Sequence, residues 1–217
     1  MTNLDIYKDI SARTGGAVMI GVVGPVRTGK STFIKRFMEM LVIPNIEDEY
    51  ARERARDELP QSGSGRTIMT AEPKFVPEDA VRIRLGDDTS CMVRFVDCVG
   101  YMVQGASGRF EDGSERLVTT PWFDHEVTMT EAAESGTRKV ICDHSTIGLV
   151  ITTDGSICDI DREAYIEPER RVVSELKSIG KPFVILLNSA QPDSERTIEL
   201  ERQLSAEYEA PCIRVNC

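Results

Sequence analysis

The sequence predicts an α/β fold of three layers, with helices on both faces of a mostly parallel sheet and one antiparallel hairpin at the edge of that sheet. Two observations support this prediction. An apolar run at 17–23 leads through a glycine-containing turn into an amphipathic stretch, and apolar runs alternate with helical patterns from residue 147 to the end. Such alternation is typical of a parallel sheet covered by helices. At 217 residues and 41% hydrophobic content, the chain can bury a substantial core.

The first strand and the first helix flank a short glycine-containing loop. The run Ala17-Val18-Met19-Ile20-Gly21-Val22-Val23 indicates a buried strand, and the stretch from Ser31 to Met38 indicates an amphipathic helix. Between them, Gly24-Pro25-Val26-Arg27-Thr28-Gly29-Lys30-Ser31 has the pattern G-x-x-x-x-G-K-[ST], in the context that this motif requires. The sequence therefore predicts a phosphate-binding loop, or P-loop, for a nucleoside triphosphate.

The residue types of this loop suit the binding of phosphates. Gly24 and Gly29 can adopt backbone angles closed to other residues, so that successive N–H groups turn toward the phosphates at the positive end of the helix dipole. Lys30 would reach the β- and γ-phosphates, and Ser31 would ligate Mg²⁺. The nucleotide-binding residues predicted in this loop are Gly24, Val26, Arg27, Thr28, Gly29, Lys30, Ser31 and Thr32.

A charged stretch and a flexible one follow the first helix. Residues 44–60 carry closely mixed charges, which indicates a solvated helix. The segment Gln61-Ser62-Gly63-Ser64-Gly65-Arg66-Thr67 is flexible by composition, so a bound ligand could order it.

An antiparallel hairpin is expected next. Apolar residues alternate at 81–85 and again at 91–96, and Gly86-Asp87-Asp88 lies between the two stretches. Asp97 stands at the end of the second strand and begins the sequence Asp97-Cys98-Val99-Gly100, which has the form D-x-x-G. The end of a strand is where a carboxylate can meet a ligand bound at the neighbouring loop.

The second half of the chain returns to regular alternation after a long irregular stretch. Residues 101–140 are expected to form a long mobile connection with a helix-like stretch near 126–133. The elements expected after it are a strand at 147–152, a helix at 167–179 followed by Gly180, a strand at 183–187, a helix at about 195–208 and a strand at 212–216. A parallel sheet normally has helices on both faces, so a chain that stops on a strand is expected to be the N-terminal part, 1–217, of a longer protein, forming its nucleotide-binding domain.

Composition narrows the class of function. The formal net charge of −10 argues against sequence-independent binding to nucleic acid or to an acidic membrane surface. The N-terminus lacks the features of a signal peptide, and no window is apolar over a membrane-spanning length, so we expect a cytoplasmic protein. No C-x-x-C pair or metal-site spacing is present, and reduced core thiols are expected. The cysteines are Cys91, Cys98, Cys142, Cys158, Cys212 and Cys217.

The order of these features indicates a mechanism. A P-loop, a helix, a threonine-bearing loop, a hairpin and then D-x-x-G is the order of the translation-factor-like, Ras-related branch of P-loop NTPases. In that frame Thr70, or failing it Thr67, would sense Mg²⁺ and the γ-phosphate, Asp97 would hold Mg²⁺ through water, and Gly100 would offer its N–H to the γ-phosphate. The predicted catalytic residues are Lys30, Thr70, Asp97 and Gly100, and the predicted metal residues are Ser31, Thr70 and Asp97.

Tyr101 follows D-x-x-G where many Ras-like enzymes carry a glutamine that orients the attacking water. Intrinsic hydrolysis is therefore expected to be slow. Gln104, backbone groups or a residue supplied in trans could orient the water instead, and the sequence does not decide among them.

The choice of base depends on the loop after the strand at 183–187. Guanine-specific members place N-K-x-D there, but this chain has Asn188-Ser189-Ala190-Gln191. A neutral glutamine replaces the carboxylate that accepts from guanine, whereas an amide can donate to and accept from the edge of adenine. Asn188 and Gln191 are thus predicted to contact an ATP base, and GTP remains the alternative if a shifted loop brings Asp193 to the base.

The chain resembles the stage IV sporulation protein A family of endospore-forming bacteria over its whole length. The resemblance is carried by Gly24–Ile34, Thr67–Pro77, Asp97–Tyr101 and Asp143–Gly148. It implies an ATPase of GTPase-like ancestry whose hydrolysis drives static self-association into the basement layer of the spore coat, on the forespore surface in the mother cell. Ala71 resembles a place for a second threonine in this family, so the resemblance implies that sensing of Mg²⁺ and the γ-phosphate rests more heavily on Thr70.

The resemblance also implies partners that this stretch of chain does not contain. Family members have further middle and C-terminal domains, which engage a small amphipathic membrane peptide and other spore coat proteins. Two classes of function stay open: an ATP-hydrolysing assembly protein, and a GTP- or ATP-dependent regulatory switch that acts through a protein partner.

Overall fold

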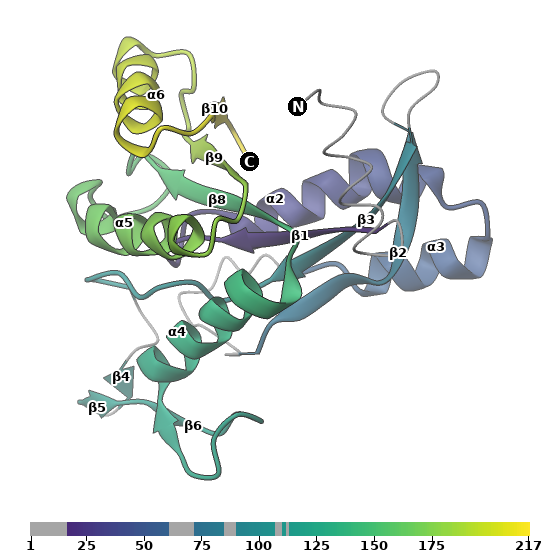
Figure 1. Ribbon diagram of the computed structural model, residues 1–217, viewed down its shortest axis with the longest axis horizontal. Helices are drawn as coiled ribbons and strands as arrows, with labels where there is room; N and C mark the ends of the chain where they lie inside the picture. Colours follow the sequence, from purple (N-terminus) through teal and green to yellow (C-terminus); the bar gives the residue numbers. More distant parts are fainter. Residues whose placement is uncertain (1–16, 61–71, 85–89, 107–109, 112) are drawn as a thin grey trace.

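A six-stranded sheet forms the centre of the molecule (Figure 1). The computed structural model describes residues 17–60, 72–84, 90–106, 110–111 and 113–217. The strand order is β10-β9-β8-β1-β3-β2, with β2 antiparallel to β3 and every other neighbouring pair parallel. The strands are β1 (Ala17–Val23), β2 (Lys74–Arg84), β3 (Ser90–Asp97), β8 (Ile147–Thr153), β9 (Phe183–Asn188) and β10 (Cys212–Val215). The predicted fold class is confirmed.

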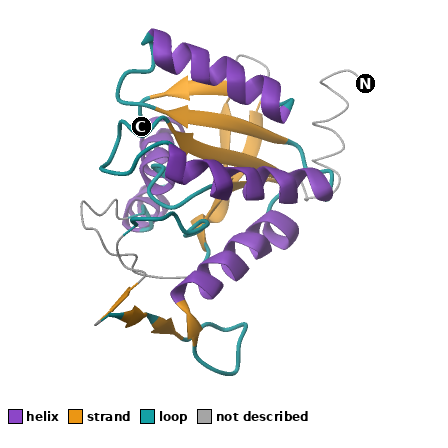
Figure 2. Cartoon of the chain, turned by 90° about the vertical axis from the view of Figure 1, so that its left-hand side faces the viewer, coloured by secondary structure: helices purple, strands orange, loops and turns teal. Residues whose placement is uncertain are grey.

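Helices cover both faces of this sheet (Figure 2). On one face, α2 (Lys30–Phe37) continues through a π-helical turn (Met38–Val42) and a short 3-10 turn (Ile43–Asn45) before α3 (Glu49–Asp57). The other face is covered by α5 (Glu163–Ser178), by α6 (Glu195–Tyr208) and by the π-helical turn Val140–His144 that continues α4 (Met129–Lys139). The charged stretch at 44–60 thus contains a helix, as predicted.

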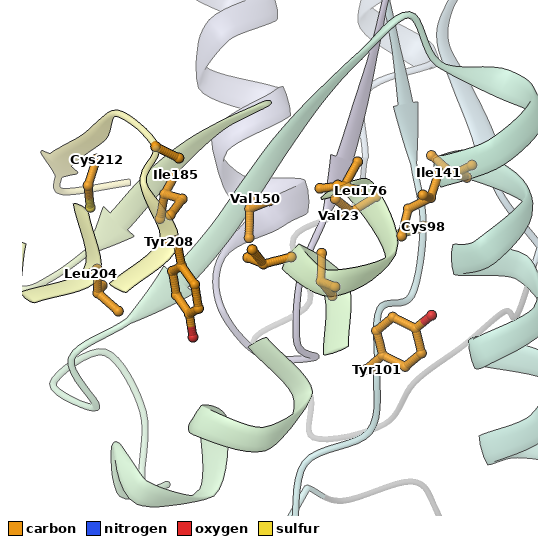
Figure 3. Packing of buried hydrophobic residues seen from close by; sticks show 14 of the residues in the cluster. Val23, Cys98, Tyr101, Ile141, Val150, Leu176, Ile185, Leu204, Tyr208 and Cys212 are labelled. Carbon is orange, nitrogen blue, oxygen red and sulfur yellow. The ribbon is translucent and has the colours of Figure 1, made fainter. Parts of the chain in front are cut away.

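Neighbouring residues of the central strands pack into opposite layers of the core. Val22 belongs to the cluster under α2, whereas Val23 belongs to the cluster under α5 and α6, and Ile151 and Val150 divide in the same way. Figure 3 shows Val23, Val150 and Ile185 in the second of these clusters. Successive side chains of a strand point to opposite faces, so a strand buried on both sides needs a continuous apolar run.

The boundaries differ from the prediction in two places. The hairpin has the predicted partners, but its first strand begins at Lys74, and the turn at 85–89 lies outside the described residues, as does the segment 61–67. Helix α5 begins at Glu163 rather than at residue 167. The sequence pattern hid this first turn because Pro168 suggests a helix start, yet it lies inside the helix.

The interpretation of 101–140 as one mobile connection is wrong for much of that stretch. Short strands pair there, β4 (Phe110–Glu111) with β5 (Ser114–Glu115) and β6 (Leu117–Val118) with β7 (Val127–Thr128), and α4 then runs to Lys139. The hydroxyl oxygen of Thr128 caps α4 by accepting from the N–H of Glu131 over 3.1 Å. Pairs of two-residue strands leave no periodic pattern in the sequence, which is why the prediction missed them.

The cysteine thiols are all free, but they do not all lie in the core. Only Cys98 and Cys212 are buried, and Cys142 is exposed. The description of the six as core thiols is therefore correct for two of them. In the part of the chain that the structure describes, no helix is long and apolar enough to cross a membrane.

A buried ion pair joins α5 to the sheet and to α6. Glu169 is fully buried, and the guanidinium of Arg162 binds its carboxylate at 2.7 and 2.8 Å. The hydroxyl of Tyr208 also donates to this carboxylate, over 2.7 Å, and so does that of Thr152. The carboxylate thus ties three elements together.

Replacing Glu169 with alanine is expected to lower the free energy of unfolding by about 3–5 kcal/mol, because it leaves a largely buried guanidinium without its partner. Urea unfolding of this variant, beside Glu167→Ala as an exposed control on the same helix, measures the loss. Equal midpoints for the two variants would show that the ion pair does not hold the layers together.

Candidate nucleotide-binding site

The P-loop residues 24–31 have a backbone that only glycine can adopt at two positions. Gly24 and Gly29 have φ values of 136° and 93°. A Cβ on Gly24 would lie 2.2 Å from the carbonyl oxygen of Ile151, and one on Gly29 would lie 2.4 Å from the side-chain nitrogen of Asn188. Arg27 also has a positive φ, of 66°. Helix α2 begins directly after Gly29 without a side-chain cap, which leaves its first N–H groups facing the loop.

Lys30 folds back over the loop. Its ammonium nitrogen lies 2.6 Å from the carbonyl oxygen of Pro25 and 3.4 Å from that of Gly24, and the residue is only 5% exposed. Burial lowers the pKa of the ammonium, and the nearby Cys98 and Asp97 partly oppose this. Thr28, predicted as a nucleotide contact, is buried and donates to the same carbonyl of Pro25 over 2.9 Å. The lysine charge is thus held at the centre of the loop.

Ser31, in the first turn of α2, contacts Asp97 at the end of β3. Asp97 ends β3, which runs parallel to β1 with Val22 opposite Asp97. The hydroxyl of Ser31 donates to one carboxylate oxygen of Asp97 over 2.8 Å. Burial raises the pKa of this carboxyl, and the hydrogen bond from Ser31 and the charge of Lys30 partly oppose the rise. Its other oxygen, Oδ1, is buried without a hydrogen-bond partner among the described residues.

The D-x-x-G segment packs directly on the P-loop. The N–H of Tyr101 donates to the carbonyl of Gly24 over 3.2 Å, and the N–H of Val26 donates to the carbonyl of Tyr101 over 2.9 Å. Gly100 has a φ of 96°, and a Cβ there would lie 2.1 Å from the carbonyl oxygen of Gly24. The N–H of Gly100 donates to the hydroxyl oxygen of Thr137 on α4 over 3.1 Å. Sequence reasoning missed Thr137 because no motif marks it.

Tyr101 is held in place by two side chains of α5. Its hydroxyl donates to Glu175 over 2.6 Å, and the guanidinium of Arg171 lies 4.4 Å from the centre of its ring. Burial and the neighbouring Glu175 raise the pKa of the phenol. A side chain held in this way is not free to orient a water molecule. Gln104, in contrast, is exposed.

Asn188 connects the P-loop to the end of the chain. Its amide nitrogen donates to the carbonyl of Thr28 over 3.0 Å, and its amide oxygen accepts from the N–H of Cys217 over 3.0 Å. The side chain is buried, with 3% exposure of the residue. In this arrangement both polar ends of Asn188 bind the protein backbone, so the residue shapes the P-loop rather than presenting its amide to a base.

The loop predicted to contact the base is organised by a residue that sequence reasoning did not select. Asp154 follows β8 and accepts from the hydroxyl of Ser189 over 2.6 Å and from that of Ser156 over 2.5 Å. Burial raises the pKa of its carboxyl, but the hydrogen bonds from Ser156 and Ser189 outweigh this and the pKa is lowered. Ser189 in turn accepts from the N–H of Gln191, whose residue is exposed. A carboxylate at the end of a buried strand was the signal that could have revealed Asp154.

The remaining predicted residues lie outside the described part of the chain, in the core, at the P-loop or beside Arg214. Thr70 and the alternative Thr67 lie outside the described residues, as does Ala71. Val26 is 2% exposed and packs with Val103 and Tyr165, so it serves the core. Arg27 and Thr32 are half-buried at the loop. Asp193, the alternative contact for guanine, lies 3.4 Å from the guanidinium of Arg214.

The structure therefore gathers a lysine, a serine, an aspartate and a glycine N–H at the ends of β1 and β3. Paired with uncapped amides at a helix start, these groups can bind a phosphate chain, and the unpartnered oxygen of Asp97 can accept a cation or its water. No cluster of three or more histidine, cysteine, aspartate or glutamate side chains suited to holding a metal by themselves occurs in the described ranges.

Comparison with known proteins agrees with this chemistry. A family model described as "Stage IV sporulation protein A, ATPase domain" matches residues 1–217. Stage IV sporulation protein A is 59% identical to this chain over 214 residues in Clostridioides difficile (strain 630), 56% over 216 residues in Bacillus anthracis and 53% over 216 residues in Bacillus subtilis (strain 168). These matches cover 99–100% of this chain but only 44% of each relative.

Solved structures of SsGBP mutation variants are similar over nearly the whole chain. The match to one of these variants covers 98% of this chain and 53% of the variant's chain, with 15% sequence identity and a TM-score of 0.46. A similarity at this level says nothing about the function of the chain.

Proposed function

Because this chain belongs to the family of the stage IV sporulation protein A ATPase domain, we propose that it binds Mg²⁺-ATP at the P-loop and hydrolyses it during spore formation. The observation that supports this best is the contact between Ser31 and Asp97, which lie far apart in the sequence and meet beside the ammonium of Lys30. A hydroxyl, a carboxylate and a lysine in this arrangement are the groups that bind Mg²⁺ and the terminal phosphates in P-loop NTPases.

The chain's own residues bind and orient the phosphates. Lys30 exchanges the carbonyl oxygens of Pro25 and Gly24 for phosphate oxygens, which are stronger acceptors because they are charged. The N–H groups at the start of α2 turn toward the same oxygens, and the glycines at 24 and 29 let the loop approach closely. Asn188 keeps the loop in this shape through the carbonyl of Thr28.

Ser31 and Asp97 would hold Mg²⁺, and Thr70 is proposed as its third residue. The fit rests on Asp97, whose Oδ1 is buried and has no partner among the described residues. A cation at this point would satisfy that oxygen and offset the cost of burying the carboxylate. When bound, Mg²⁺ would neutralise part of the negative charge of the phosphates.

Slow intrinsic hydrolysis is the expected behaviour of this site. Tyr101 is held by Glu175 and Arg171, so it does not orient the attacking water. Gln104, backbone groups or a residue supplied in trans are the remaining candidates.

The proposed base is adenine, contacted from the loop that ends in Gln191. Ser189, in the place of the lysine of guanine-specific relatives, is fully buried and bound to Asp154, so a lysine there would disturb the loop. The exposed Gln191 is the position to change.

Gln191→Asp is expected to shift preference toward GTP severalfold, because a carboxylate can accept from two donors of guanine but faces an acceptor on the adenine ring. At this exposed position such a mismatch is worth about 1 kcal/mol. Competition of ATP and GTP for a labelled nucleotide analogue measures the shift, with Gln191→Asn as the control that keeps the amide. Asp193→Asn tests the alternative: a wild-type chain that prefers GTP and loses this preference in Asp193→Asn would overturn the assignment to ATP.

We further propose that hydrolysis drives self-association of the whole protein into the basement layer of the spore coat, on the forespore surface in the mother cell. The family resemblance supports this. Light scattering of the protein with ATP, GTP or neither tests it: scattering that grows only with ATP supports assembly. Nucleotide binding and hydrolysis without any growth in scattering would favour the second candidate, a regulatory switch that acts through a partner.

A further inference from the structure

The N–H of Gly100 already has a partner within the protein. It donates to the hydroxyl oxygen of Thr137 over 3.1 Å. Thr137 is fully buried on α4 and donates its own hydroxyl hydrogen to the carbonyl of Ala133 over 2.7 Å. Since its hydrogen points to Ala133, the oxygen of Thr137 is oriented as an acceptor. An N–H bound in this way cannot give a full hydrogen bond to a phosphate at the same time.

The residues on both sides of this N–H are fixed. The thiol of Cys98 donates to the carbonyl of Val22 over 3.4 Å, so the segment is anchored to β1. On the other side, Tyr101 is bound through its N–H to Gly24 and through its carbonyl to Val26. Only the peptide group between Val99 and Gly100 is left to turn, and a glycine with a φ of 96° tolerates such a change better than any other residue.

Gly100 also lies at the place where a γ-phosphate would arrive. A Cβ on Gly100 would lie 2.6 Å from the ammonium nitrogen of Lys30. Lys30 is the residue proposed to reach the γ-phosphate, so the N–H of Gly100 needs only a local rotation to reach the same group. The γ-phosphate and the hydroxyl of Thr137 are therefore competing acceptors for one donor.

We propose that Thr137 is a positioning residue that holds the N–H of Gly100 away from the nucleotide until a γ-phosphate replaces it, and that it thereby sets the preference of the site for ATP over ADP. This inference rests on the proposed binding of Mg²⁺-ATP at the P-loop. ADP lacks the competing acceptor and binds with the Thr137 contact intact. ATP must break that contact. Because the N–H is free in only a small fraction of molecules, the apparent dissociation constant of ATP is the intrinsic one divided by that fraction.

Thr137→Val tests this directly, because valine keeps the shape of threonine and removes the acceptor. The N–H of Gly100 then has only the sulfur of Cys98, a weak acceptor, beside it when no γ-phosphate is bound. A poorly paired buried donor is costly, so the ratio of the dissociation constants of ADP and ATP is expected to rise by up to about tenfold. Thr137→Ser retains the hydroxyl and is expected to keep the wild-type ratio. Calorimetric titration with Mg²⁺-ADP and with a non-hydrolysable Mg²⁺-ATP analogue gives both constants on each protein.

The ratio of the two dissociation constants remains informative if Thr137→Val lowers stability. Both nucleotides are titrated into the same protein, so a reduced folded fraction changes the dissociation constants of ADP and ATP by the same factor. An unchanged ratio in Thr137→Val, or the same rise in Thr137→Ser, overturns the role of Thr137. A wild-type chain that binds neither nucleotide overturns the proposed function and this inference with it. The same holds if the Lys30→Met variant binds both nucleotides as tightly as the wild type does.

Discussion

Lys30→Met is expected to abolish the stabilisation of the chain by Mg²⁺-ATP. Methionine has a stem of similar length but no ammonium, and the ammonium of Lys30 is held at the centre of the P-loop by the carbonyls of Pro25 and Gly24. A ligand that binds only the folded state raises the free energy of unfolding by about 2.7 kcal/mol at 100 times its dissociation constant. Thermal unfolding with and without Mg²⁺-ATP measures this gain, which is expected in the wild type and absent in the variant.

Burial of Lys30 decides which replacement is informative. A P-loop lysine aimed at phosphates would be expected to pack little, but the residue is only 5% exposed and burial lowers the pKa of its ammonium. Methionine is therefore a better replacement than alanine, because it fills the space of the aliphatic stem without the cost of a buried charge. Lys35→Met on the same helix is the matched control. A Lys30→Met variant that Mg²⁺-ATP stabilises as much as the wild type would contradict the phosphate assignment.

Asp97→Asn is expected to retain nucleotide binding and to lose hydrolysis by at least about 100-fold, the usual cost of removing one group that stabilises charge in the transition state. The P-loop amides and Lys30 remain in the variant, so affinity for ADP should change little. Burial raises the pKa of the Asp97 carboxyl, which means that the ionised form is disfavoured without a cation. A neutral amide should thus leave the nucleotide-free protein at least as stable as before.

Phosphate release from ATP at saturating Mg²⁺, measured beside the melting temperature, checks both halves of this expectation. Asp79→Asn, on the neighbouring strand and with a side chain 80% exposed, is the control. Hydrolysis at the wild-type rate in Asp97→Asn would show that this carboxylate does not serve the reaction. Thr70→Ala is expected to behave like Asp97→Asn if Thr70 completes the metal site.

Local patterns were sufficient to predict the sheet and the P-loop. The strand at 17–23, the glycines at 24 and 29 and the helix that follows form one continuous segment, so their meaning can be read from neighbouring residues. The same holds for Asp97, whose place at a strand end puts it beside the loop of the adjacent parallel strand. The antiparallel edge of the sheet follows from the hairpin that precedes D-x-x-G.

Contacts between distant segments could not be predicted from the sequence. Thr137 reaches Gly100, and Asp154 reaches Ser189, only after the fold has brought α4 and β9 to the site. Asn188 was predicted to contact a base, but its amide is bound to backbone groups that no local pattern identifies. The prediction for 101–140 failed for a related reason, because the two-residue strands there are stabilised by pairing and not by a pattern of their own.

The most direct measurement of the proposed site is a crystal structure of the chain with Mg²⁺ and a non-hydrolysable ATP analogue. The expected result places the β- and γ-phosphates on the amides of the P-loop, the ammonium of Lys30 on the γ-phosphate instead of on Pro25, and Mg²⁺ between the hydroxyl of Ser31 and the carboxylate of Asp97. Phosphates bound elsewhere, or a Lys30 ammonium that still contacts only the carbonyls of Gly24 and Pro25, would contradict the proposal that this loop binds and hydrolyses ATP.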